Sequence, residues 1–285
     1  MKKTIGAFAF LLTLIFAFSC AKEIQPPAKP AKVAVVLGAG AAKGFAHIGV
    51  LKVLEANKIP VHMIVGTSAG SFVGSLYSYG YNAFELQKAS FALEKDDIID
   101  LTIPDNGFIK GEKIESYINK MVRNAPIEKL RIPFYAVATD IQTGREVLFA
   151  SGNTGTAVRA SCSIPGIFVP PVISGRTYVD GGVVSPVAVE AARKFGADVV
   201  IAVDISGDSA QSVPSGTIET MLQSISIMYG KISAAQLSKA DVVIKPKVGY
   251  IGAADFTKRH EAVLEGEKAA LAALPNIQEI LQRLR

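Results

Sequence analysis

The sequence predicts a three-layer α/β/α domain built on a mostly parallel central sheet. Short uninterrupted apolar runs, such as Val33–Leu37 and the interior of Asp198–Asp204, are typical of strands buried on both faces. Segments with apolar residues at helical spacing alternate with these runs, which indicates a parallel sheet between two layers of helices. Hydrophobic residues make up 49% of the 285 residues and charged residues only 19%, so the chain can bury a large core.

The N-terminal segment has the pattern of a lipoprotein precursor. Two lysines precede the apolar run Ile5–Phe18, which is too short to span a bilayer but fits the hydrophobic part of a signal peptide. The run ends in small residues followed by Cys20, and this arrangement resembles the lipobox of bacterial lipoproteins. The resemblance implies a signal peptide over residues 1–19 and a protein held in the bacterial cell envelope by lipid on Cys20, with Ala21 favouring the outer membrane. A plain signal peptide or a short anchor helix is the alternative.

Two strand–turn–helix units are expected after a tether. Residues 20–32 are rich in Pro, Lys and Ala and are interpreted as that flexible tether, so the folded domain covers residues 33–285. The strand at 33–37 is followed by a helix over Phe45–Asn57, where apolar side chains recur at helical spacing. A second short strand over Val61–Val65 leads through a turn into a helix over Ala69–Tyr79.

The rest of the domain repeats this alternation. Short apolar runs are expected to be strands, and longer segments with apolar residues at helical spacing are expected to be helices. The expected strands are 133–140, 147–150, one ending at 178–179, 198–204 and 241–244, and the expected helices are 186–195, 217–239 and 258–274. Stretches rich in Gly, Ser or Pro, near 106–111 and over 206–216, are expected to be loops.

A nucleophile elbow is the first candidate for chemistry. Gly66-Thr-Ser68-Ala-Gly70 matches the pattern G-x-S-x-G between a predicted strand and a predicted helix, which is the context that this turn requires. Its glycines permit a strained turn that raises the serine hydroxyl above the sheet, at the N-terminus of a helix whose dipole favours negative charge. The alternative is a tight turn in which Ser68 caps the helix.

A turn of small residues, Gly38–Gly44, follows the first strand. Its backbone N–H groups can point into the space above the strand ends, where acyl transfer needs donors for a tetrahedral oxyanion. The candidate oxyanion-hole residues are Gly38, Gly40, Ala41 and Lys43, together with Ala69 after the serine. A dinucleotide fingerprint would need a small residue in place of Lys43 and an acidic residue at the end of the second strand, so no nucleotide is expected.

A carboxylate follows a later strand. Asp180-Gly181-Gly182 comes directly after Tyr178-Val179, and the carboxyl end of a strand is the usual place for chemistry in open α/β sheets. The alternative is an ordinary turn, because Asp-Gly is common in turns.

Together these motifs resemble the patatin-like phospholipase family. The resemblance rests on Gly38–Lys52, Gly66–Gly70 and Asp180–Gly182 in this order, and on Arg159–Phe168, and it extends from residue 33 to about residue 260. It implies a patatin-like fold in which Ser68 is the nucleophile and Asp180 takes its proton directly, as a dyad without histidine. Backbone N–H groups near Gly40 and Ala41 would form the oxyanion hole.

The chain departs from the family pattern in the turn after the first strand. The family often has a glycine-rich run followed by Arg, whereas this chain has Ala39 and Ala41 in place of glycines and Lys43 in place of the Arg. Alanine adopts positive φ less readily than glycine. Lysine keeps the positive charge but lacks the planar fork of donors.

One histidine, one cysteine and a group of aromatic residues are further candidates for roles in the site. The order Ser68, Asp180, His260 would fit an α/β-hydrolase triad, although His260 lies at the expected exposed start of a helix. Cys162 is interpreted as a buried small hydrophobe rather than a nucleophile, because no histidine lies near it in the sequence. Aromatic residues after the elbow, Phe72, Tyr77, Tyr79, Tyr81 and Phe84, are expected to line an acyl channel or to belong to the core.

The predicted function is therefore a serine acyl hydrolase that cleaves fatty-acyl esters of lipids. No metal or organic cofactor is expected, because no cluster of ligand residues is visible. The net charge of +5 comes without basic runs interleaved with aromatics, which argues against nucleic-acid binding. A lipid anchor would hold such an enzyme at its substrate surface. The alternatives are a thioesterase or acyltransferase with the same dyad, and a non-enzymatic lipid-binding envelope lipoprotein.

Overall fold

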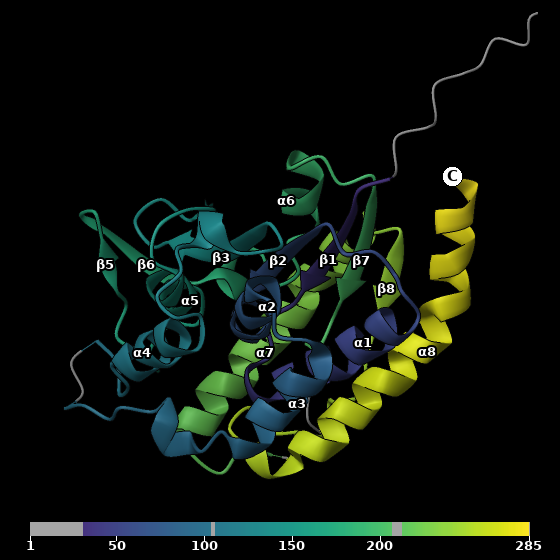
Figure 1. Ribbon diagram of the computed structural model, residues 1–285. Helices are drawn as coiled ribbons and strands as arrows, with labels where there is room; N and C mark the ends of the chain where they lie inside the picture. Colours follow the sequence, from purple (N-terminus) through teal and green to yellow (C-terminus); the bar gives the residue numbers. More distant parts are fainter. Residues whose placement is uncertain (1–30, 104–105, 207–212, 285) are drawn as a thin grey trace, which may run out of the picture.

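A central sheet of eight strands has helices on both faces (Figure 1). This computed structural model describes residues 31–103, 106–206 and 213–284. The predicted signal peptide and Cys20 lie outside the described residues, as does most of the expected tether. The expectation of a three-layer α/β/α fold with a mostly parallel sheet is confirmed. No helix in the described part of the chain is long and apolar enough to cross a membrane.

The strands follow the order β5-β6-β3-β2-β1-β7-β8, and β4 also pairs with β3. Their bounds are β1 Val33–Leu37, β2 Met63–Thr67, β3 Phe134–Asp140, β4 Arg145–Phe149, β5 Val172–Ile173, β6 Arg176–Asp180, β7 Val199–Val203 and β8 Val242–Ile244. The five strands β3, β2, β1, β7 and β8 are parallel, whereas β4 and β6 run antiparallel to β3. The central strands β1, β2 and β7 are buried along their whole length, which explains their uninterrupted apolar sequences.

The helices form the outer layers. Their bounds are α1 Phe45–Ala56, α2 Ala69–Tyr79, α3 Ala83–Ala92, α4 Glu112–Met121, α5 Thr154–Ser161, α6 Val189–Lys194, α7 Thr217–Leu237 and α8 Arg259–Arg283. Helices α3, α4 and α5 were not among the helices expected from the sequence. A reciprocal capping box between Asn82 and Glu85 at the start of α3 is a sequence signal that could have found that helix.

Helix α8 extends beyond its expected end. It was expected to stop at Leu274, because proline usually ends or kinks a helix, but it continues through Pro275 to Arg283. Ile277, two residues after the proline, is fully buried in the main core. Burial of apolar surface beyond Pro275 therefore offsets the backbone hydrogen bond that proline cannot make.

Candidate active site

Ser68 lies at the junction of β2 and α2, in a strained backbone conformation. Its φ of 54° and ψ of −122° are unusual for a residue with a Cβ. Its N–H donates to the hydroxyl of Ser161 at 2.9 Å, which ties the turn to α5. A Cβ on Gly70 would lie 1.9 Å from the carbonyl oxygen of Leu37, so only glycine lets α2 approach β1 this closely. The strand–turn–helix context predicted for the elbow is present.

Asp180 is brought beside Ser68 by strand register. Thr67, which precedes the serine, pairs with Val137 on β3, and the next residue of β3, Ala138, pairs with Asp180 at the end of β6. Ser68 and Asp180 therefore approach each other across one strand. The carboxyl group is fully buried, and its Oδ1 accepts the N–H of Gly182 at 2.7 Å.

Burial makes Asp180 a stronger base than a carboxylate in water. Burial raises the pKa of this carboxyl to about 6, although the Ser68 hydroxyl, the Gly182 N–H and the Tyr229 hydroxyl each lower it. Among the described residues, no group donates a hydrogen bond of normal distance and angle to the second carboxylate oxygen, Oδ2. A buried carboxylate oxygen beside a serine hydroxyl, with a pKa near 6, is suited to accept a proton at neutral pH.

Tyr229 on α7 is a site residue that the sequence analysis missed. Its buried hydroxyl lies beside Asp180 and also makes no hydrogen bond of normal distance and angle with any described residue. Burial, followed by the charge of Asp180, raises the pKa of the phenol, so it stays protonated and can donate. Its ring packs against Gly182, where an added Cβ would lie 2.3 Å from the ring. The second glycine after Asp180 thus makes room for the tyrosine.

Three backbone N–H groups near Ser68 are available for an oxyanion. Within the described residues, those of Gly40, Ala41 and Ala69 have no acceptor. Ala41 has a φ of 50°, so this alanine adopts the left-handed conformation for which glycine is usual. Ala41 and Ala69 both line the cavity into which Ser68 opens, which allows their donors to converge there.

Two of the predicted oxyanion donors are wrong. The Gly38 N–H donates to the Val203 carbonyl at 3.0 Å, and the Lys43 N–H donates to the Gly40 carbonyl at 3.1 Å. The first bond extends the pairing of β1 with β7, and the second closes a short 3-10 turn. Neither group is free to stabilise a developing negative charge.

Lys43 contributes a buried ammonium group instead. Its Nζ donates to the Ser206 carbonyl at 3.1 Å, and only 4% of the residue is exposed. Burial lowers the pKa of Lys43, while nearby Asp204 opposes that change. The side chain therefore places a cation behind the turn that follows β1.

His47 makes a hydrogen bond to the start of this turn. Its Nε2 lies 2.8 Å from the Gly38 carbonyl oxygen, so the ring carries its proton there and donates to that carbonyl. Burial lowers the pKa of the imidazole to about 4, so the ring is neutral at pH 7. Its other nitrogen, Nδ1, is buried without a partner among the described residues. We interpret His47 as a residue that fixes the peptide between β1 and the oxyanion donors.

The other histidines lie elsewhere. His260 packs against Phe91, with ring centroids 3.9 Å apart and the rings tilted by 32°, at the start of α8. His62 accepts the N–H of Val33 through Nδ1 at 3.0 Å. Within the described residues, no hydrogen bond joins a histidine to Ser68 or Asp180. The geometry offers no support for the triad that was considered as an alternative.

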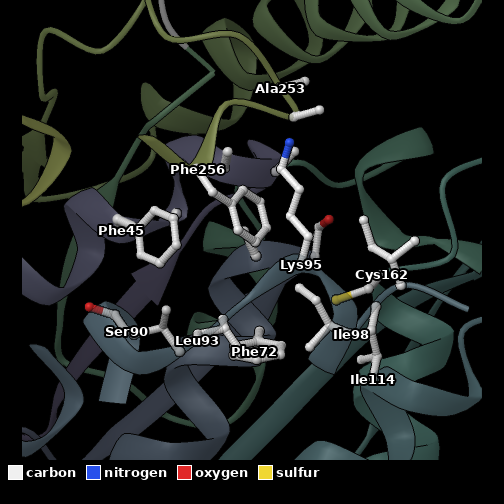
Figure 2. A pocket seen from close by; sticks show the side chains of 18 of the residues that line it. Phe45, Phe72, Ser90, Leu93, Lys95, Ile98, Ile114, Cys162, Ala253 and Phe256 are labelled. Carbon is white, nitrogen blue, oxygen red and sulfur yellow. The ribbon is translucent and has the colours of Figure 1, made fainter. Parts of the chain in front are cut away.

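Ser68 opens into an apolar cavity of about 230 Å³. Phe72, Ile98 and Ile114 surround its interior in Figure 2, while Lys95 reaches toward Ala253 at one edge. Phe72 is the only one of the five aromatic residues named after the elbow that lines this cavity, and Phe84 is exposed to solvent. Tyr77 belongs to the main core, and Tyr79 and Tyr81 pack against it, which was the alternative interpretation of these residues. Most of the cavity lining comes from elements distant in sequence.

Cys162 also lines the cavity, and its surroundings keep it unreactive. Burial, followed by the charge of Asp180, raises the pKa of its thiol, so the reactive thiolate is disfavoured. Its Sγ lies 3.8 Å from the hydroxyl of Ser71. The interpretation of Cys162 as a small buried hydrophobe agrees with this environment.

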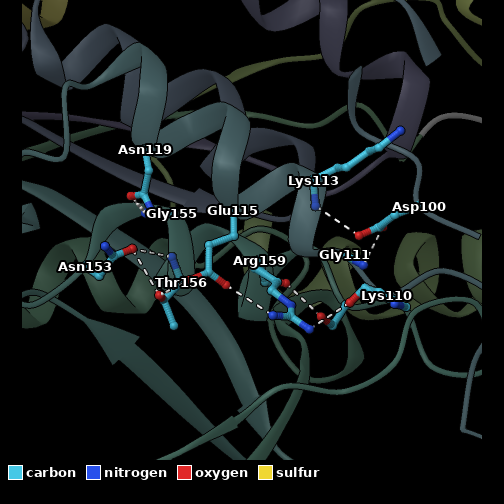
Figure 3. A network of polar contacts seen from close by, with 11 residues as sticks. Asp100, Lys110, Gly111, Lys113, Glu115, Asn119, Asn153, Gly155, Thr156 and Arg159 are labelled. Atoms are coloured by element: carbon cyan, nitrogen blue, oxygen red, sulfur yellow. Dashed lines mark hydrogen bonds and ion pairs between the residues drawn. The ribbon is translucent and has the colours of Figure 1, made fainter. Parts of the chain in front are cut away.

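A polar network holds one wall of the cavity in place (Figure 3). Arg159 on α5 donates to the Glu115 carboxylate of α4 at 3.2 Å and to the Lys110 carbonyl at 2.8 Å. Thr156 donates to the same carboxylate at 2.7 Å. These bonds tie α4, α5 and the loop before α4 together. That loop carries Ile109 and α4 carries Ile114, and both residues line the cavity.

Comparisons with known proteins agree with the sequence motifs. Residues 35–193 match the family model described as "Patatin-like phospholipase". An uncharacterised NTE family protein of Mycobacterium tuberculosis is 34% identical over 215 residues, which cover 72% of this chain and 59% of that protein. A protein of Coccidioides immitis named as a lysophospholipase is 30% identical over 89% of this chain and 18% of its own length. The chain thus spans about three fifths of the mycobacterial relative.

A solved structure is similar in fold. VipD from Legionella pneumophila superposes with a TM-score of 0.51 over 87% of this chain and 67% of that chain. The sequence identity is 14%, so this similarity concerns the fold alone.

Proposed function

Because the chain belongs to the patatin-like phospholipase family, we propose that it hydrolyses fatty-acyl esters of lipids, with Ser68 as nucleophile and Asp180 as general base. The observation that carries the proposal is the placement of the Ser68 hydroxyl between a buried carboxylate and an apolar cavity of about 230 Å³. The carboxylate supplies the base that a serine nucleophile needs. The cavity supplies a dry site for an acyl chain.

The proposed reaction proceeds in two steps. Asp180 accepts the proton of Ser68 as the serine oxygen attacks the ester carbonyl carbon. The carbonyl oxygen becomes an oxyanion that accepts hydrogen bonds from the N–H groups of Gly40, Ala41 and Ala69. Asp180 then protonates the departing alcohol. In the second step Asp180 takes a proton from a water molecule that attacks the acyl-enzyme, and it returns this proton to the Ser68 oxygen as the fatty acid leaves.

Release of fatty acid from lysophosphatidylcholine and of p-nitrophenol from a short-chain ester is the direct test. We expect both substrates to be hydrolysed by the wild-type protein. An acyl-thioester of the same chain length distinguishes a thioesterase, which would cleave it in preference to both oxygen esters. A folded protein that releases no product from any of these would contradict the proposed function.

His260→Ala is expected to retain activity within about threefold of wild type, because this ring packs against Phe91 and makes no hydrogen bond to Asp180 in the described part of the chain. The measurement is kcat/KM on the p-nitrophenyl ester. A loss of several hundredfold in a folded variant would replace the dyad with a triad.

The pH dependence should report the ionisation of Asp180. We expect kcat/KM to rise with pH, with its midpoint at about pH 6 and a plateau above about pH 7, because only the carboxylate can accept the serine proton. Tyr229→Phe removes a hydroxyl that lowers the pKa of Asp180, so the midpoint should move to higher pH. Tyr81→Phe is the matched control, because the Tyr81 hydroxyl donates to the Met121 carbonyl instead. An unchanged or lower midpoint in Tyr229→Phe would contradict this role of the tyrosine.

We further propose that Cys20 carries a lipid anchor that holds the enzyme at a membrane of the bacterial cell envelope. A cell fed a labelled fatty acid should then incorporate the label into the wild-type protein and into Cys162→Ser, but not into Cys20→Ser. Cys162 is the matched control because it is the other cysteine of the chain and lies buried in the domain. Equal labelling of all three proteins would rule out Cys20 as the site.

A further inference from the structure

The apolar cavity beside Ser68 is closed where α2 and α3 meet. Its lining residues on α2 fall on one face of that helix, because they are spaced three and four apart. They are Ala69, Phe72, Val73 and Leu76. Leu76 is the last residue of α2 that lines the cavity, and Leu86 is the first of α3. Both leucines are buried, and only residues 80–82 connect the two helices, so this pair marks the closed end.

The opposite end of the cavity is open to solvent at Lys95. This side chain is exposed, and Figure 2 shows its ammonium group extended toward Ala253. Among the described residues that line the cavity, no other side chain is charged. The closed end presents aliphatic groups, including Leu76 and Leu86. The acyl chain of a substrate bound at Ser68 is therefore expected to extend toward the two leucines, away from water.

The depth of the cavity below Ser68 follows from helix geometry. Ser68 directly precedes α2, and Leu76 lies eight residues further along the chain. At about 1.5 Å of rise per residue, the two Cα atoms are about 12 Å apart along the helix axis. An extended acyl chain advances about 1.3 Å per carbon, because its staggered C–C bonds are each about 1.5 Å long. This depth therefore accommodates about nine carbons.

The volume of the cavity gives a similar limit. A cavity of about 150 Å³ that is lined by Leu, Ile and Phe holds one benzene molecule, which has six carbons. In proportion, the cavity of about 230 Å³ beside Ser68 holds about nine carbons. Depth and volume are separate measures of the cavity, and both indicate an acyl chain of medium length.

We propose that the enzyme is selective for esters of medium-chain fatty acids, of about eight to ten carbons, and that Leu76 and Leu86 set this limit. The proposal rests on the proposed ester hydrolysis at Ser68. Each methylene that enters the cavity leaves water, which raises kcat/KM by up to about fourfold, the equivalent of about 0.8 kcal/mol. Carbons beyond the closed end gain nothing, because they can be accommodated only by displacing buried leucines or by leaving the cavity.

The first test is a series of p-nitrophenyl esters whose acyl chains range from about four to about fourteen carbons, each assayed below its critical micelle concentration. We expect kcat/KM of the wild-type protein to rise by up to about fourfold per carbon until about nine carbons, and to stop rising beyond about ten. A value that rises at the same rate through the whole series, or that is independent of chain length, would overturn the proposal.

Leu76→Ala should lengthen the preferred chain. The substitution removes three carbons from the closed end, so we expect the optimum to move by about two to three carbons toward longer chains. Leu54→Ala is the matched control, because Leu54 is a buried leucine of the same main core that does not line the cavity. Its optimum should equal that of wild type. An unchanged optimum in a folded Leu76→Ala protein would contradict the role given to this leucine.

Ala89→Leu should shorten the preferred chain, and it does not require a cavity to be enlarged. Ala89 lines the cavity from α3, and leucine is a good helix former, so the fold should tolerate the change. The three added carbons occupy space that the acyl chain would use, so the optimum should move by about two to three carbons toward shorter chains. This variant decides the question if Leu76→Ala does not fold, and an optimum at the wild-type length would count against the proposal.

Binding of unreactive ligands separates the chain-length limit from hydrolysis. Straight-chain methyl ketones of about six to about fourteen carbons are titrated calorimetrically into Ser68→Ala. We expect their affinity to increase with chain length and to level off at about nine to ten carbons. If the wild type hydrolyses no ester but ketone affinity levels off at this length, the proposed function fails and the limit stands. If esters are hydrolysed without a preferred length, the limit fails and the proposed function stands.

Discussion

Ser68→Ala is expected to lower kcat/KM for the p-nitrophenyl ester by about 10⁴- to 10⁶-fold, because the acyl-enzyme can no longer form. Ser75→Ala is the matched control. Ser75 is a buried serine on the same helix, and its hydroxyl donates only to the Phe72 carbonyl within that helix. We expect this control to stay within about threefold of wild type. Residual activity of several per cent in Ser68→Ala would mean that another group attacks the ester.

Substitutions of Ser68 should also reveal the strain in its backbone conformation. A residue with a Cβ at φ 54° and ψ −122° costs on the order of 1–3 kcal/mol, whereas glycine tolerates this conformation. We therefore expect Ser68→Gly to have a higher free energy of unfolding than Ser68→Ala, by about 1 kcal/mol after the greater backbone entropy of glycine is subtracted. Urea denaturation of the two inactive variants measures this difference. A lower free energy of unfolding for Ser68→Gly would show that the elbow is unstrained.

Asp180→Asn is expected to abolish activity and to stabilise the protein at neutral pH. Loss of the base should lower kcat/KM by about 10⁴-fold. The pKa of Asp180 is raised from 3.8 to about 6 by burial, so the native state binds a proton more tightly than the unfolded chain. The free energy of unfolding therefore falls as the pH rises from about 4 to about 6, by up to about 3 kcal/mol.

The asparagine avoids this loss because it stays neutral and can still accept the Gly182 N–H. Urea denaturation at pH 5 and pH 8 should show that Asp180→Asn exceeds wild type by about 1–3 kcal/mol at pH 8 and by less at pH 5. A variant that is less stable than wild type at pH 8 would contradict the unfavourable burial of this carboxylate.

Asp140→Asn is expected to change the free energy of unfolding at pH 8 in the opposite direction. Burial favours a raised pKa here too, but the Arg176 guanidinium and the N–H groups of Thr143 and Gln142 outweigh it, so the pKa of Asp140 is lowered. A lowered native pKa stabilises the fold above the pKa of the unfolded chain, and that stability is lost as the pH falls. Asp140→Asn should therefore be less stable than wild type at pH 8, and Asp180→Asn more stable.

The parts of the site that are formed by continuous segments of the chain could be predicted from the sequence. The elbow at Ser68 and the small-residue turn after β1 are continuous segments between a strand and a helix, and their geometry depends on glycine, alanine and serine at fixed spacing. The central strands were also predictable, because burial on both faces requires an apolar residue at each position. The three-layer fold follows from this alternation of strands and helices.

The position of Asp180 was predicted for a reason that the fold does not support. The carboxyl end of a parallel strand is the usual place for catalytic groups, but β6 runs antiparallel to β3. Asp180 reaches Ser68 because it pairs with Ala138, one residue beyond the partner of Thr67. Register between strands that are distant in sequence leaves no local signal, so the sequence could name the residue but not its geometry.

The remaining features depend on tertiary structure alone. Tyr229 approaches Asp180 from α7, and the Lys43 ammonium donates to the Ser206 carbonyl, which is distant in sequence. The apolar cavity is lined by segments from Ala41 to Phe256. A periodic pattern reveals that a side chain is buried but not which distant side chain it meets. Local chemistry thus identified the proposed nucleophile and its turn, while long-range packing determined the ionisation of Asp180, the backbone N–H groups that are available near Ser68 and the shape of the apolar cavity.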